Sequence, residues 1–104
     1  MNPSVGQKAG KGESMELTDL PNIGPVLAEN LRQIGVETPE ALREVGAEEA
    51  FLRIRRSVDG GACLHQLSAL AGAELGLPKA ALTPERKAAL KAFFQEIKKK
   101  ERES

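Results

Sequence analysis

The residue types that most often carry catalysis are scarce in this chain of 104 residues, which holds one His and one Cys. Cys63 and His65 stand two positions apart, so on a helix their side chains would point to roughly opposite sides, which disfavours a thiolate–imidazole pair. A metal site needs several ligands at matched spacing, and the sequence offers no second Cys or His. We therefore predict that the protein is not an enzyme and has no metal, cofactor or small-molecule substrate.

Neither of these two residues requires a chemical role. We expect Cys63 to be a small buried apolar residue and His65 to lie at the surface or its boundary. The adjacent carboxylates of Glu48 and Glu49 stand at an expected helix start, where they favour the helix dipole. No glycine-rich phosphate loop of the P-loop or Rossmann type is present. A small hydrolase or redox enzyme would instead require a Cys63 thiol that is exposed and reactive.

The most informative local motif is a tight turn at residues 20–25, with the sequence LPNIGP. Asn22 and Gly24 are the two residue types that enter positive φ most readily, and Pro25 suits the first turn of a helix. The longer stretch LPNIGPVLAENL resembles the helix-hairpin-helix motif. In that motif the free backbone N–H groups at the start of the second helix can hold a DNA phosphate without reading base sequence.

The turn departs from the DNA-binding version of this motif in two ways. Asn22 stands where a first glycine is usual, and Val26 and Leu27 stand where a basic or hydroxyl side chain would reach the phosphate. The leading interpretation is therefore a structural turn that packs helices, and phosphate binding is the alternative. The candidate contact residues of the turn are Asn22, Ile23, Gly24 and Pro25.

Charge is balanced over the whole chain, with 15 basic and 15 acidic residues, but it is not evenly distributed. Residues 15–50 carry a net charge of −6, which should repel DNA, whereas residues 78–104 carry +4. The candidate basic contact surface lies in or near the second half of the chain; its residues are Arg53, Arg55, Arg56, Lys91, Lys98 and Lys99. The alternative for these residues is an ordinary solvated helix surface.

Every apolar pattern from Met15 onward has helical spacing, and none alternates with the period of a strand. The core must come from Leu, Ala, Val and Ile, since only 3% of residues are aromatic. Cap-plus-proline pairs at 38–39 and 83–84 predict helix starts, and Gly46 and Gly76 predict helix ends. We predict an all-α fold, a compact bundle of about five short helices, in which residues 64–75 form the most buried helix.

The domain is expected to span residues 15–97, between a flexible tail at 1–14 and a charged, frayed end at 98–104. The tail is rich in Gly, Ser, Pro and Lys and could instead be a linker remnant. No apolar run is long enough to cross a membrane, and a single Cys cannot form an internal disulfide. A cytoplasmic protein with no membrane contact is therefore expected.

Three motifs run through the chain between about Leu17 and Phe94: LPNIGP, IGVETPEALREVGAEEAFLRIR and CLHQLSALAGA. In these motifs the chain resembles the C-terminal domain of the TfoX/Sxy family of bacterial competence regulators. The resemblance implies a bundle of about five helices and a non-catalytic regulatory role beside the cyclic-AMP receptor protein at promoters of DNA-uptake genes. Two-domain members carry an N-terminal α/β domain before this one, whereas fourteen residues precede the domain here. Only Asn22, Gly24 and Pro25 carry over, as a structural turn.

Two functions remain open on this basis. The first is a regulatory interaction module that contacts a protein partner in transcription regulation. The second is sequence-independent DNA binding through the turn and the basic C-terminal segment.

Overall fold

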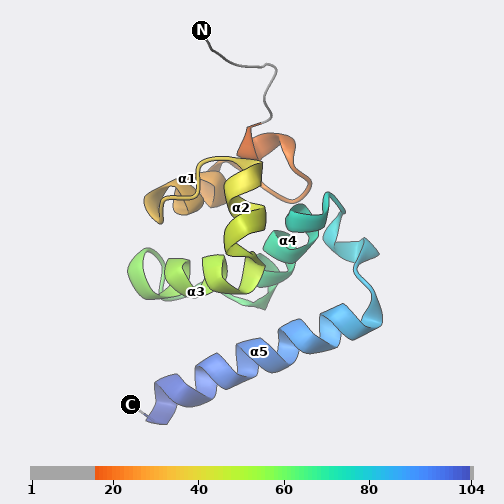
Figure 1. Cartoon of the computed structure of the whole chain (residues 1–104). Coiled ribbons are helices and arrows are strands. Elements are labelled where there is room, and N and C mark those ends of the chain that lie inside the picture. The colour runs from red at the N-terminus through yellow and green to blue at the C-terminus, as the bar shows by residue number, and fades with distance from the viewer. Residues whose placement is uncertain (1–15, 104) are drawn as a thin grey trace, which may run out of the picture.

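The computed structural model describes residues 16–103, and within this range it contains helices and turns but no strand, which confirms the all-α prediction (Figure 1). The predicted tail at residues 1–14 lies outside the described residues. Two short 3-10 turns, η1 and η2, accompany five α-helices. In chain order the elements are η1 (Leu17–Asp19), α1 (Pro25–Gln33), α2 (Pro39–Val45), α3 (Ala47–Ser57), α4 (Leu64–Leu75), η2 (Lys79–Ala81) and α5 (Pro84–Glu103).

The helix boundaries follow local capping chemistry. The Thr38 hydroxyl accepts a hydrogen bond from the Ala41 N–H at 3.1 Å, and the Thr83 hydroxyl accepts one from the Arg86 N–H at 3.1 Å. Each threonine precedes a proline that begins the helix, as the sequence predicts. Gly76 ends α4 in the left-handed conformation, at φ 74°.

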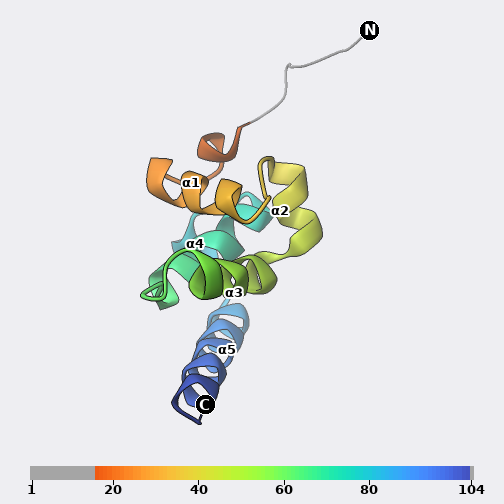
Figure 2. The ribbon, with the colours of Figure 1, turned by 90° about the vertical axis from the view of Figure 1, so that its left-hand side faces the viewer.

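Helix α4 forms the centre of the fold, as predicted from its nearly continuous apolar surface. It packs against α2, α3, α5 and η2, and Leu67, Leu70 and Ala71 on it are fully buried. Figures 1 and 2 show α1 and α2 on one side of α4 and α5 on the other. Helices α1 and α2 of the acidic first half therefore lie on the opposite side of the central helix from the basic last helix.

Helix α5 has 20 residues and continues to Glu103, through most of the segment 98–104 that was expected to fray. The difference has a physical cause, because Glu101 near the end of α5 pairs with Arg55 on α3. Phe94 of α5 also packs edge-to-face on the buried Phe51 of α3, with ring centroids 6.0 Å apart. These contacts fix the last turns of α5 against the domain.

Cys63 is exposed, so the prediction of a buried thiol is wrong. It occupies the N-cap position of α4, with an extended backbone, and the buried apolar position belongs instead to Ala62. His65 is exposed, which agrees with its predicted place at the surface. Because both residues lie at the start of α4, the interior of the domain contains neither side chain.

Candidate functional site

Asn22 ties the hairpin turn to a distant part of the chain. It is the one non-glycine residue with positive φ in the described range, at 72°. Its side-chain Nδ2 donates to the carbonyl oxygens of Ala69, at 3.3 Å, and Leu77, at 3.0 Å, while Oδ1 accepts from the Lys79 N–H at 3.2 Å. The amide therefore bridges the turn to the end of α4 and the start of η2.

Gly72 makes room for this bridge. A Cβ atom built on Gly72 would lie 2.6 Å from the Leu77 carbonyl oxygen and 2.7 Å from Asn22 Nδ2. Gly72 and Leu77 are also joined by a backbone hydrogen bond of 2.8 Å. Gly72 was not singled out from the sequence, although a glycine inside a helix is a signal of close backbone approach.

The remaining turn residues keep the backbone shape of the helix-hairpin-helix motif but carry no polar side chain. Ile23 is buried, and Gly24 is the N-cap of α1, followed by Pro25 in the first turn. No side chain caps this helix, and Val26 beside it is 75% exposed. The element before the turn is a single 3-10 turn of three residues, so the pair of helices expected for a helix-hairpin-helix is not complete. These observations support the structural interpretation of the turn.

The three arginines proposed as one contact surface have different surroundings. Arg53 pairs with Glu49 in its own helix at 2.9 Å, whereas Arg55 is largely buried and forms a bidentate pair with Glu101, with Nε–Oε2 at 2.8 Å and Nη2–Oε1 at 2.9 Å. Arg55 also donates to the Ala62 carbonyl oxygen. Arg56 is exposed and has no salt bridge within residues 16–103. Arg55 is therefore a structural residue, and the prediction that it belongs to an open surface is wrong.

The contact between Arg55 and Glu101 shifts the pKa values of both side chains. The hydrogen bond from Arg55 holds the pKa of the Glu101 carboxyl below its usual value, and the same bond raises the pKa of Arg55. Arg55 also lies over the Phe94 ring, 5.6 Å from its centroid, and Lys98 contacts the same ring at 5.6 Å. Lys98 is thus partly engaged within the domain, whereas Lys91 and Lys99 are exposed.

A second arginine–carboxylate pair, which the sequence analysis missed, joins the beginnings of α3 and α5. Arg86 binds Glu48 through Nη1–Oε2 at 2.5 Å and Nη2–Oε1 at 2.9 Å. The hydrogen bond from Arg86 lowers the pKa of Glu48, and the bond to Glu48 raises the pKa of Arg86. Glu48 was interpreted only through the helix dipole, since nothing local connects residues 38 positions apart. Together the two pairs clamp α5 along α3 near both ends.

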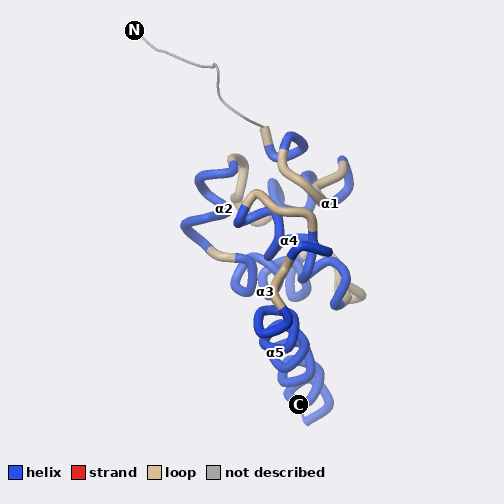
Figure 3. Tube along the Cα trace, turned by 90° about the vertical axis from the view of Figure 1, so that its right-hand side faces the viewer, coloured by secondary structure: helices blue, strands red, loops and turns tan. Residues whose placement is uncertain are grey.

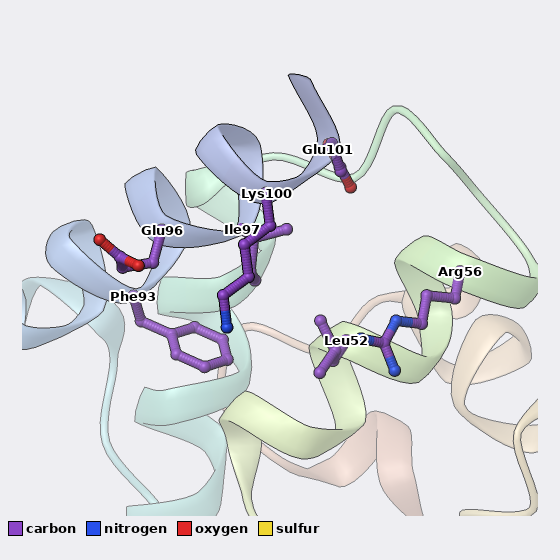
Figure 4. A pocket seen from close by; sticks show the side chains of 7 residues that line it. All are labelled: Leu52, Arg56, Phe93, Glu96, Ile97, Lys100 and Glu101. Atoms are coloured by element: carbon purple, nitrogen blue, oxygen red, sulfur yellow. The ribbon is translucent and has the colours of Figure 1, made fainter. Parts of the chain in front are cut away.

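Between the clamps, α3 and α5 enclose a groove of about 490 Å³, shown in Figure 4. Its floor is apolar and is formed by Leu52 of α3 with Phe93 and Ile97 of α5. Figure 4 shows Arg56 on the α3 side, opposite the α5 residues. The charged residues that line the groove are Arg56, Glu96, Lys100 and Glu101. An apolar floor between charged edges is the general form of a groove that accepts an amphipathic helix.

Residues 16–103 contain no group of three or more His, Cys, Asp or Glu side chains that could hold a metal ion. Within the same range no helix is long and apolar enough to cross a membrane.

Comparison with known proteins identifies relatives of the whole described domain. Two crystal structures of proteins from Listeria monocytogenes are similar to it. The first, described as an uncharacterized protein in a triclinic form, is 42% identical to this chain, with a TM-score of 0.79. The match covers 81% of this chain and 94% of the Listeria chain. The second, described as a protein of unknown function in a tetragonal form, is 43% identical to this chain, with a TM-score of 0.75. The match covers 78% of this chain and 98% of the Listeria chain.

The search of curated proteins found no match. The family model of the TfoX C-terminal domain matches residues 13–94, which is most of the chain and includes the turn, all of α1 to α4 and the first half of α5. The resemblance expected from the sequence is thereby confirmed, and the chain belongs to the TfoX C-terminal domain family.

Proposed function

We propose that this domain is a non-catalytic interaction module in the regulation of DNA-uptake competence, and that it acts by contacting a protein partner at the α3–α5 groove. Membership of the TfoX C-terminal domain family supports the regulatory context. The observation that carries the proposal is the groove itself, whose apolar floor lies between two helices that arginine–carboxylate pairs join near both ends. A rigid, preformed groove reduces the entropic cost of binding.

The chemistry of the groove specifies the occupant. Leu52, Phe93 and Ile97 match an apolar stripe on a partner helix, with residues spaced by three or four positions. Arg56 stands at the edge without a salt bridge in the described part of the chain and can pair with a carboxylate of the partner. The partner segment is therefore an amphipathic helix with an acidic residue beside its apolar stripe.

Substitution of Arg56 tests this assignment without disturbing the core, because its side chain is exposed. The assay captures proteins from a nuclease-treated extract of the source bacterium on the immobilised domain, and the affinity is then measured with the purified partner. Arg56→Glu should weaken binding about tenfold, since a charged contact at the edge of the groove is reversed. Arg43→Glu makes the same charge change on α2, away from the groove, and should leave the affinity within about twofold.

A second pair of variants tests the apolar floor. Leu52 is partly exposed in the groove, and Leu52→Gln should weaken binding about tenfold. Val26→Gln removes a more exposed apolar side chain at the start of α1 and should have no effect. Wild-type affinity of both groove variants, or retention of nucleic acid alone, would contradict the proposal. Loss of competence-gene expression with Arg56→Glu and its retention with Arg43→Glu would link the contact to regulation.

A further inference from the structure

A second depression lies on the other flank of α5, where α4, η2 and α5 meet. It encloses about 480 Å³ and has apolar and basic walls. Its polar side chains are those of His65 and Ser68 from α4, Lys79 from η2, and Lys87 and Lys91 from α5. No acidic side chain of the described residues lines it. This distinguishes it from the α3–α5 groove, where carboxylates and cations alternate along the edge.

The three lysines have no internal electrostatic partner. Lys79, Lys87 and Lys91 are exposed and form no ion pair within residues 16–103. The nearby cations Arg55 and Arg86, by contrast, are paired with Glu101 and Glu48. Three like charges around one depression repel one another, and an anion bound among them relieves that repulsion.

Spacing along α5 extends this basic surface beyond the depression. Lys87, Lys91, Lys98 and Arg102 are separated by 4, 7 and 4 positions, which places them on one face of the helix. The row is about 22 Å long at the helical rise of about 1.5 Å per residue. Lys98 and Arg102 line a further shallow depression on α5, together with Lys99 and the carboxylate of Glu96. The cations therefore form a line rather than a single cluster.

The position of the row within the domain favours a long polyanion. Figures 1 and 3 show α5 on the side of the molecule away from α1 and α2. Residues 16–46, which include α1 and α2, carry six acidic and two basic side chains, so a polyanion meets repulsion on that side and attraction along α5. Among residues 16–103 the exposed large apolar residues are Val26, Leu75 and Leu77. None of them lies on α5, so the row lacks the apolar side chains that a membrane-surface helix inserts.

We infer that the depression formed by α4, η2 and α5 binds phosphate groups of a nucleic-acid backbone, with the row on α5 following neighbouring phosphates. Lys79, Lys87 and Lys91 neutralise a phosphate at the depression, and the Ser68 hydroxyl and His65 ring donate hydrogen bonds to its oxygens. Binding is independent of base sequence, because every contact is to the backbone. The site is separate from the α3–α5 groove, so either assignment can fail without the other.

Salt dependence of duplex binding tests the inference. The affinity for a labelled 20-base-pair DNA is measured by fluorescence anisotropy at several salt concentrations, for the wild type and for Lys87→Gln/Lys91→Gln. Each lost phosphate contact lowers the slope of log affinity against log salt by about one, so the double variant should lower it by about two. Both lysines are exposed, and retention of the fold is checked by circular dichroism.

The matched control is Arg32→Gln/Arg43→Gln, which makes the same change in net charge within the acidic half of the chain. It should leave the slope unchanged. An equal fall in both double variants would show a response to net charge alone and overturn the inference, as would the absence of duplex binding at low salt.

Two competitors identify the ligand. Inorganic triphosphate and polyglutamate are each added at the same charge concentration as unlabelled duplex. The inference predicts that duplex competes best, because only the backbone presents phosphates along the whole row. Equal competition by triphosphate would indicate a site for a small phosphorylated ligand. Equal competition by polyglutamate would show that the site does not distinguish phosphate from carboxylate. Either result contradicts the inference.

Discussion

The hairpin turn and the basic flank of α5 are two regions in which the sequence suggests phosphate contact, and the structure uses their polar groups in opposite ways. All three hydrogen bonds of the Asn22 amide are made to backbone groups of the same domain. Lys87 and Lys91 make no ion pair in the described range. A motif that preserves a backbone shape therefore predicts packing, whereas polar groups left without an internal partner indicate a surface available to a ligand.

The largest effect expected from this comparison comes from removing the Asn22 bridge. Asn22→Ala loses three hydrogen bonds and places a non-glycine residue without local stabilisation at positive φ, so it should destabilise the domain by about 3 kcal/mol. Asn22→Gly keeps the backbone conformation and loses only the bonds, so it should cost about 2 kcal/mol. Urea unfolding measures both. Equal stability of Asn22→Gly and the wild type would show that the bridge contributes nothing.

Gly72→Ala tests the same bridge from the α4 side. The added Cβ would lie 2.6 Å from a backbone oxygen, and the backbone has to move, so a loss of about 2 kcal/mol is expected despite the better helix propensity of alanine. Gly60→Ala is the control, because the nearest atom to its Cβ is 4.0 Å away. Unfolding midpoints that are the same for both variants would contradict the proposed close approach.

The clamp between Arg86 and Glu48 should contribute a smaller amount. A double-mutant cycle with Arg86→Met and Glu48→Gln is expected to give a coupling of about 1 kcal/mol, because the pair is bidentate and about two-thirds buried. The Arg53–Glu49 pair lies in one helix and is about half exposed, so its coupling should be about 0.3 kcal/mol. Couplings of equal size would show that the clamp is no more than a surface ion pair.

The same clamp predicts a pH dependence. The pKa of Glu48 is lowered in the folded state from its ordinary value of 4.5, so its stabilising effect is present above that pH and is lost as the pH falls through the folded-state pKa. The difference in unfolding free energy between the wild type and Glu48→Gln should therefore shrink on acidification below about pH 4.5. A difference that stays constant down to pH 3 would contradict the assigned cause.

Local signals explain why the fold could be predicted from the sequence. Thr38 and Thr83 cap the helices they precede, and glycines end α2 and α4 where expected. These interactions join residues a few positions apart, so the sequence displays both partners. The prediction of Cys63 as buried failed because apolar spacing cannot distinguish the last residue of a loop from the first residue of a helix face.

The functional surfaces depend instead on distant pairs. Arg55 meets Glu101 across 46 positions, and Asn22 meets Lys79 across 57. Without knowledge of such contacts, the sequence does not show whether a basic side chain pairs inside the fold or stays available to a ligand. This is why Arg55 was placed on the contact surface and why Lys79 and Lys87 were left out of it.

Amide chemical shifts followed during a titration with duplex DNA at low salt test the central contrast most directly. We predict shifts in the first turns of α4, in residues 79–91 and at Lys98 and Arg102, with residues 23–27 unaffected. Shifts confined to residues 22–27 would place the phosphate at the hairpin turn and contradict the account.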